Sequence, residues 1–177
     1  MNARLALAAL LLTVLLLVRP VHSGHPRRAH GFPATVVRTV DGDTLVAAAR
    51  GRRFYVRLLG IDTPETHRPG TPIECGGQQA SASMRALAPP HARVNLEVDP
   101  GQDRIDRYGR LLAYVWLPDG RLLEDEQLRG GWASTYVFRG RPVSLFRRLA
   151  ATERSARFAG RGVWARCGGD FHTPASR

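Results

Sequence analysis

Carboxylate side chains stand in two short, turn-forming segments of the sequence, each beside an apolar run. Asp43 ends the turn 41–43 and begins such a run. Asp62 and Glu65 lie on either side of Pro64, which places them in a loop and not on a helix. Carboxylate oxygens are hard ligands for divalent cations, and a carboxylate outside the metal's ligand set can accept a proton from water. These acids therefore fit a metal-assisted hydrolytic site, although each segment alone also fits an ordinary turn.

Cationic side chains occur at two further places. Arg57 interrupts an apolar run, where a charge is costly unless it faces solvent, a partner or a bound anion. The segment 106–110, Asp-Arg-Tyr-Gly-Arg, places basic residues beside an aromatic ring and a glycine, which suits close approach to a phosphate or a base. An outward-facing strand residue and a solvated turn are the alternatives. Together with the acids, these cations provide what phosphodiester hydrolysis needs: metal ligands, a base and positive charge at the transition state.

The elements that would position these residues can be predicted from hydrophobic periodicity and turn residues. Five runs have β-strand character, at 34–40, 45–49, 53–59, 94–98 and 111–117. Three segments have helical spacing, at 78–87, 122–129 and 145–158, with Ser144 as a candidate N-cap of the third. A helix between the third and fourth strands of five predicts an α+β fold, a five-stranded OB-type β-barrel with three helices. Such barrels often bind oligonucleotides along one strand face.

Three motifs, in this order along the chain, resemble those of the thermonuclease (staphylococcal nuclease-like) family. They are Asp-Thr at 43–44, Arg-Leu-Leu-Gly-Ile-Asp-Thr-Pro-Glu-Thr at 57–66, and Asp-Arg-Tyr-Gly-Arg at 106–110 followed by Leu-Ala-Tyr at 112–114. The resemblance extends from about residue 35 to residue 164. It implies a five-stranded OB barrel with three helices, a Ca2+ cofactor, and hydrolysis of DNA and RNA to 3′-phosphate products.

The resemblance also implies roles for the acidic loop residues. Asp43 and Asp62 would ligate Ca2+ through their carboxylates, and Thr63 would do so through its backbone carbonyl. Glu65 would be the general base that activates the attacking water. The metal and the base would thus come from two loops that are distant in sequence.

The same resemblance implies that five residues bind substrate. Arg57 and Arg110 would bind the scissile phosphate and stabilise its developing charge. Arg107, Tyr108 and Tyr136 match positions that contact the nucleotide beyond the scissile bond. The expected partner is nucleic acid, with no stable protein partner and a monomeric chain.

A non-catalytic OB-fold module that binds nucleic acid is the alternative function. The presence together of Asp43, Arg57, Asp62, Glu65 and Arg110 favours catalysis, because a module that only binds has no need of the complete set.

The charge of the chain favours a polyanionic partner without proving one. The sequence has 26 basic side chains and 15 acidic ones, a formal net charge of +11. Such a charge attracts nucleic acid through its long-range field and through counterion release. All the basic residues are Arg and none is Lys, a pattern that genomic base composition also produces. Charge alone therefore leaves the partner open.

The N-terminal segment predicts export. Arg4 precedes an apolar run at 5–18, which is the length of a signal-peptide core and short for a membrane span. We expect a signal peptide at 1–23, a basic linker at 24–31 and a secreted or extracytoplasmic protein. An uncleaved membrane anchor is the alternative.

The two cysteines of the sequence, Cys75 and Cys167, bear on the same question. An even number of cysteines in an exported chain favours a disulfide, and two unpaired thiols are the alternative. The nuclease domain is expected at 32–167, followed by a flexible tail at 168–177.

Overall fold

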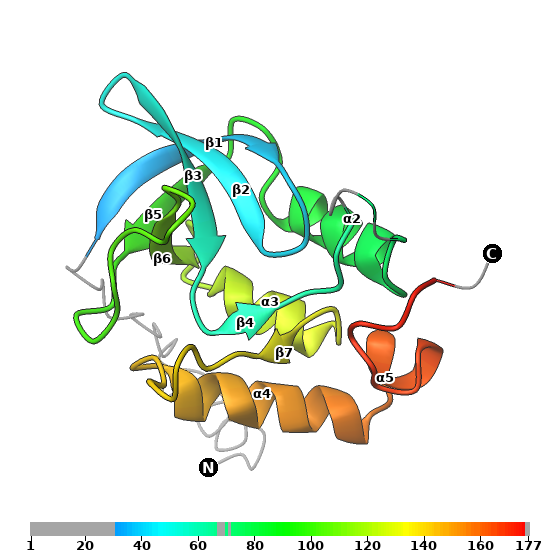
Figure 1. The fold of residues 1–177 in the computed structure, drawn as a ribbon. Helices are drawn as coiled ribbons and strands as arrows, with labels where there is room; N and C mark the ends of the chain where they lie inside the picture. Colours follow the sequence, from blue (N-terminus) through cyan, green and yellow to red (C-terminus); the bar gives the residue numbers. More distant parts are fainter. Residues whose placement is uncertain (1–30, 67–69, 71, 176–177) are drawn as a thin grey trace, which may run out of the picture.

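The fold combines a β-barrel with helices that pack beside it (Figure 1). The computed structural model describes residues 31–66, 70 and 72–175, and within them the barrel has five strands in the order β1-β2-β3-β6-β5. The strands are β1 (Phe32–Thr39), β2 (Thr44–Ala49), β3 (Arg52–Leu58), β5 (Arg93–Glu97) and β6 (Leu111–Trp116). This architecture confirms the predicted OB-type barrel and its five strand segments.

Antiparallel pairing joins β1 to β2, β2 to β3, β1 to β5 and β5 to β6. The barrel closes through the parallel pair β3 and β6, in which Arg57 is opposite Leu112. Alternate side chains point inward and are fully buried, among them Val36, Leu45, Val56 and Leu96. Because the two faces alternate, Arg57 leaves the barrel on the side opposite to its buried neighbour Val56.

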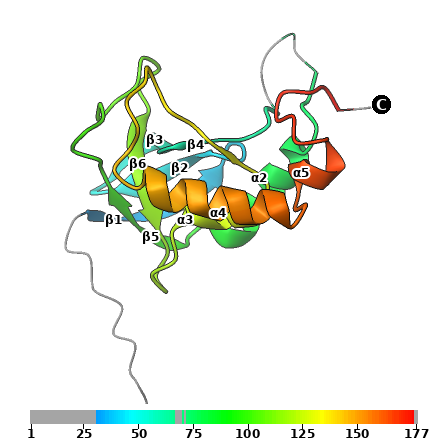
Figure 2. The same cartoon turned by 90° about the horizontal axis from the view of Figure 1, so that it is seen from below.

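The three predicted helices are present and pack beside the barrel (Figure 2). They are α2 (Gly77–Leu87), α3 (Leu123–Arg129) and α4 (Phe146–Phe158). The α3 helix packs against both other helices, α2 and α4, and against β6. Its buried residues Leu123 and Leu128 join the hydrophobic core of the barrel.

The prediction that Ser144 caps the third helix is wrong. Leu145 occupies the N-cap position of α4, and no side chain caps that end. The backbone N–H of Ser144 instead donates to Asp99 Oδ2 at 2.6 Å, and its hydroxyl lies 3.2 Å from the hydroxyl of Tyr114. Ser144 thus contacts Asp99 after β5 and Tyr114 in β6, and it lies one residue before the N-cap position.

Three short elements of the described chain were not predicted. Strands β4 (Ile61–Asp62) and β7 (Ser134–Thr135) form a two-stranded sheet, and α5 (Val163–Arg166) is a single turn of helix. Two-residue strands are too short to show a period of two in the sequence. Strand β4 contains Asp62, a predicted site residue, which therefore lies outside the barrel sheet.

The predicted disulfide between Cys75 and Cys167 is confirmed, with 6.0 Å between the Cα atoms. The predicted tail from 168 onward is wrong for the described residues 168–175. Phe171 is buried and packs edge-on against Trp164, and Cys75 N–H donates to the carbonyl of Thr173 at 2.7 Å. The disulfide places this segment beside residues 73–75, whose backbone groups then pair with it.

The predicted signal peptide at 1–23 lies outside the described residues, as does the linker at 24–31 except for Gly31. In the part of the chain that the structure describes, no helix has the length and apolarity to cross a membrane.

Candidate active site

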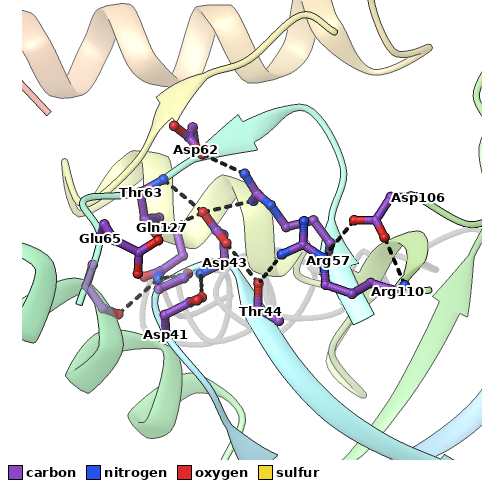
Figure 3. Close-up of polar contacts among 12 residues, drawn as sticks. Asp41, Asp43, Thr44, Arg57, Asp62, Thr63, Glu65, Asp106, Arg110 and Gln127 are labelled. Carbon is purple, nitrogen blue, oxygen red and sulfur yellow. Dashed lines mark hydrogen bonds and ion pairs between the residues drawn. The ribbon is translucent and has the colours of Figure 1, made fainter. Parts of the chain in front are cut away.

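The turn before β2, the end of β3 and the strand β4 bring Asp43, Arg57 and Asp62 together (Figure 3). Asp43 immediately precedes β2, Arg57 is next to last in β3, and Asp62 ends β4. The pairing of β2 with β3 sets Thr44 opposite Arg57 and so fixes the first two. Gly42 allows the segment that carries Asp62 and Thr63 to lie close to the turn at 41–43, because a Cβ on residue 42 would be 2.6 Å from Thr63 Oγ1.

The guanidinium of Arg57 joins the two acids. Its Nη1 lies 2.8 Å from Asp43 Oδ2 and its Nη2 lies 2.6 Å from Asp62 Oδ1. Burial acts to lower the pKa of Arg57, but the charges of Asp43 and Asp62 outweigh it and raise the pKa above its ordinary value. For the acid Asp62, burial raises the pKa above its ordinary value, and the charge of Arg57 opposes this shift. The arginine is thus a fixed positive charge between two carboxylates.

Asp43 is held in one orientation by its neighbours. It is 6% exposed, and its Oδ2 accepts both the backbone N–H and the hydroxyl of Thr63, each at 2.9 Å. Its Oδ1 accepts the hydroxyl of Thr44 at 3.1 Å. Both oxygens therefore have defined directions, and the Thr63 contacts couple the position of the β4 loop to the start of β2.

Arg110, the residue before β6, approaches the same place. Its Nε donates to Asp106 Oδ2 at 2.7 Å, and its Nη1 lies 3.5 Å from Thr44 Oγ1 (Figure 3). Asp106 also accepts the backbone N–H groups of Tyr108 and Arg110, each at 2.9 Å. Burial acts to raise the pKa of Asp106, but these hydrogen bonds outweigh it and lower the pKa below its usual value. The ionised Asp106 thereby orients Arg110.

A cleft of about 580 Å³ adjoins these groups. Six of the residues predicted to act on substrate or metal line it together: Arg57, Asp62, Arg107, Tyr108, Arg110 and Tyr136. Tyr108 is largely exposed, with the guanidinium groups of Arg107 and Arg110 at 4.7 and 5.2 Å from its ring centroid. Tyr136 and Phe138 contribute further half-exposed rings from the segment after β7. Guanidinium and aromatic groups together suit a phosphate chain with stacked bases.

Glu65, Asp43 and Thr63 are not part of the lining of this cleft. In Figure 3, Glu65 and Arg110 lie on opposite sides of Asp43. Glu65 Oε1 accepts the N–H of Thr66 at 2.8 Å, and the N–H of Glu65 donates to Glu74 Oε2 at 2.6 Å. The predicted base therefore lies in the loop that reaches the start of α2, where a Cβ on Gly77 would be 2.9 Å from the Glu65 carbonyl oxygen.

The chain is similar in sequence to known nucleases. The family model for staphylococcal nuclease homologues matches residues 55–166. The chain belongs to this family. It is 35% identical to a thermonuclease of Staphylococcus hyicus over 132 residues, which are 73% of this chain and 74% of that protein. It is 34% identical to the endonuclease YncB of Bacillus subtilis over 135 residues, 76% of this chain and 62% of YncB.

A thermonuclease of Staphylococcus intermedius is 45% identical over 84 residues, 48% of each chain. Membership of the staphylococcal nuclease family identifies the chain as a nuclease, with nucleic acid as its substrate. The family match contains Arg57, Asp62, Glu65 and Arg110 and starts after Asp43.

The structure of this nuclease-family chain adds two residues to the site that the sequence prediction missed. Asp41 Oδ1 accepts the N–H of Asp43 at 3.1 Å, and burial, followed by the charge of Asp43, raises the pKa of Asp41 to about 7. Gln127 on α3 is fully buried, and its Nε2 donates to the carbonyls of Gly42 at 2.6 Å and Ala80 at 3.1 Å. The i, i+2 spacing from Asp43 was a signal for Asp41, whereas nothing in the sequence near Gln127 pointed to the turn at 41–43.

Proposed function

We propose that this nuclease is exported and Ca2+-dependent, and that it hydrolyses phosphodiester bonds in DNA and RNA to give 3′-phosphate products. The observation that carries the proposal is the position of Arg57, which lines the cleft and contacts both Asp43 and Asp62. A phosphate-binding cation is thereby next to two hard oxygen ligands, as metal-assisted hydrolysis requires. Export is supported by the apolar run at 5–18 and by the Cys75–Cys167 disulfide, a bond that persists in oxidising compartments.

The acidic groups fit a divalent cation. Asp43 and Asp62 contact one guanidinium, so their oxygens converge, and Asp41 adds a third acid behind them. Burial first, and then the charge of Asp43, raise the pKa values of Asp41 and Asp62, so a bound cation would favour their ionised forms. Among the described residues, no three His, Cys, Asp or Glu side chains form a ligand cluster. A ligand set of two carboxylates and one backbone carbonyl needs no such cluster.

We assign the metal ligands to Asp43, Asp62 and the carbonyl of Thr63. Oxygen ligands alone are typical of Ca2+, and the hydrogen bonds from Thr63 to Asp43 keep the two loops together. When bound, the ion supplies positive charge at a phosphate oxygen.

The protein's own groups perform the remaining steps in this proposal. Arg57 and Arg110 bind the scissile phosphate from the cleft and stabilise the charge that develops on it. Glu65 accepts a proton from the attacking water. Arg107, Tyr108 and Tyr136 hold the neighbouring nucleotide by ion pairing and stacking, which works for DNA and RNA because every base has an aromatic face.

The metal assignment can be tested without measuring activity. A ligand that binds only the folded state raises the free energy of unfolding, by about 2.7 kcal/mol at about 100 times its dissociation constant. We expect such a rise on adding Ca2+ to the wild-type protein and its loss in Asp43→Asn, measured by thermal or urea unfolding. Asp119→Asn, at an exposed ion pair with Arg121 on the turn before α3, is the matched control and should keep the full effect.

A full Ca2+ effect in Asp43→Asn, or none in the wild-type protein, would contradict the assignment of the ligands.

A further inference from the structure

The loop that carries Glu65 is fastened to a second acidic residue, Glu74. The N–H of Glu65 donates to Glu74 Oε2 at 2.6 Å, and the N–H of Glu74 donates to the carbonyl of Glu65 at 2.9 Å. Glu74 is 4% exposed. Its side chain and its backbone therefore hold the peptide groups on both sides of the Glu65 Cα atom, which fixes the direction in which the Glu65 side chain leaves the backbone.

Glu74 in turn belongs to a segment that the C-terminal residues hold in place. Its neighbour Cys75 forms the disulfide with Cys167, and the Cys75 N–H donates to the Thr173 carbonyl at 2.7 Å. The Ala175 N–H donates to the Ile73 carbonyl at 2.8 Å, so residues 73–75 and 173–175 are joined through an isolated antiparallel β-bridge between Glu74 and Pro174. This C-terminal segment, 167–175, is further anchored by the buried ring of Phe171.

The C-terminal segment also reaches one of the proposed metal ligands, Asp62. His172 places Nδ1 at 3.4 Å from Glu74 Oε2 and Nε2 at 3.8 Å from Asp62 Oδ2. One imidazole thus lies between the residue that holds the Glu65 loop and a residue proposed to hold the metal. In Figure 1, the red C-terminal segment lies beside α5 and near the start of α2.

We propose that Glu74 is a positioning residue for Glu65, and that the disulfide-bonded C-terminal segment holds Glu74 in this role. The inference rests on the proposed function, in which Glu65 is the base. A general base works only when its oxygen is within hydrogen-bond reach of the water, and shifts of about 1 Å can cost on the order of 10²-fold in rate. Without the Glu74 carboxylate, the Glu65 N–H loses its partner and the loop loses a charge-assisted hydrogen bond.

The first test compares Glu74→Ala with Glu74→Gln in the purified protein. The Gln variant keeps an oxygen that can accept the Glu65 N–H, and the Ala variant does not. For Ala we expect kcat on single-stranded DNA with Ca2+ to fall about tenfold or more while KM changes less than about threefold. Gln should recover most of the lost kcat. In parallel, amide hydrogen exchange by NMR should show the Glu65 N–H exchanging at least about tenfold faster in the Ala variant than in the wild type.

The matched control is Asp99→Ala. Asp99 is also a 4% exposed carboxylate that accepts backbone N–H groups, those of Gly101 and Ser144, and it does not contact the Glu65 loop. It therefore reports what loss of a buried carboxylate does in general. We expect Asp99→Ala to leave the Glu65 exchange rate and kcat within about twofold of wild type at temperatures well below unfolding.

The second test removes the disulfide, by Cys75→Ser with Cys167→Ser or by reduction of the folded wild type. Like Glu74→Ala, either way of removing the disulfide should raise the exchange rate of the Glu65 N–H and lower kcat. The proposal is overturned if Glu65 exchange is unchanged in Glu74→Ala, or if that variant loses no more kcat than Asp99→Ala. It is also overturned if Glu74→Gln gives no recovery, or if loss of the disulfide changes neither quantity.

The exchange measurement does not depend on catalysis. A wild-type protein that fails to cleave nucleic acid would count against the proposed function, while the exchange rates would still decide whether Glu74 and the disulfide position the Glu65 loop.

Discussion

Replacing Arg57 by Lys is expected to lower kcat on single-stranded DNA by about 10³-fold, the loss typical of removing a group that stabilises transition-state charge. The guanidinium contacts Asp43 and Asp62 with two different nitrogens, at 2.8 and 2.6 Å. A lysine ammonium is a compact charge on a flexible chain. It lacks the planar pair of N–H groups with which a guanidinium can bind two oxygens at once.

The measurement is steady-state kinetics with Ca2+ in excess, together with circular dichroism to check the fold. Arg38→Lys is the matched control, since Arg38 is also a strand arginine but contacts Tyr55 on the barrel surface and does not line the cleft. We expect its kcat to stay within about twofold of wild type. Equal turnover by the Arg57→Lys and wild-type proteins would show that Arg57 does not stabilise the transition state.

Replacing Glu65 by Gln is expected to reduce kcat by about 10²-fold or more and to leave the affinity for single-stranded DNA within about threefold. Gln has nearly the same shape, and its amide oxygen can still accept the Thr66 N–H that Glu65 Oε1 accepts at 2.8 Å. The loop should therefore keep its conformation while losing a group that takes up a proton.

Binding is best measured in Ca2+ with a non-hydrolysable oligonucleotide, and cleavage with the matching natural one. Glu153→Gln on α4 is the control, because Glu153 is also a part-buried glutamate that accepts a hydrogen bond, from the Thr135 hydroxyl at 2.6 Å, and it has no proposed role in the chemistry. A near-normal rate for Glu65→Gln would show that another group activates the water.

Most of the barrel could be predicted from the sequence because its strands are long enough to show alternation. The run at 34–40 became β1 at Phe32–Thr39, and the run at 111–117 became β6 at Leu111–Trp116. The two-residue strand β4 could not be found in this way, and neither could its pairing with β7. The role of Asp62 was therefore predicted from the motif at 57–66, and the strand that contains Asp62 is seen only in the structure.

The site was predictable where a motif is local and unpredictable where distant segments meet. Asp43, Arg57 and Arg110 were identified from short stretches of sequence, and the structure brings them together. Glu74 and His172 are 98 residues apart, and their contact depends on the path that the disulfide imposes on the chain. The cysteine count predicted that disulfide, but the count does not reveal what the bonded segments touch.

The measurement that tests the central claim most directly is cleavage of single-stranded DNA by the purified protein with Ca2+ and, separately, with EDTA. We expect cleavage with Ca2+, none with EDTA, and recovery when Ca2+ is added in excess of the chelator. Cleavage that continues in EDTA would contradict the metal-dependent mechanism. DNA binding without cleavage in Ca2+ would contradict the nuclease account itself and leave a nucleic-acid-binding module whose Asp43–Arg57–Asp62 contacts serve another purpose.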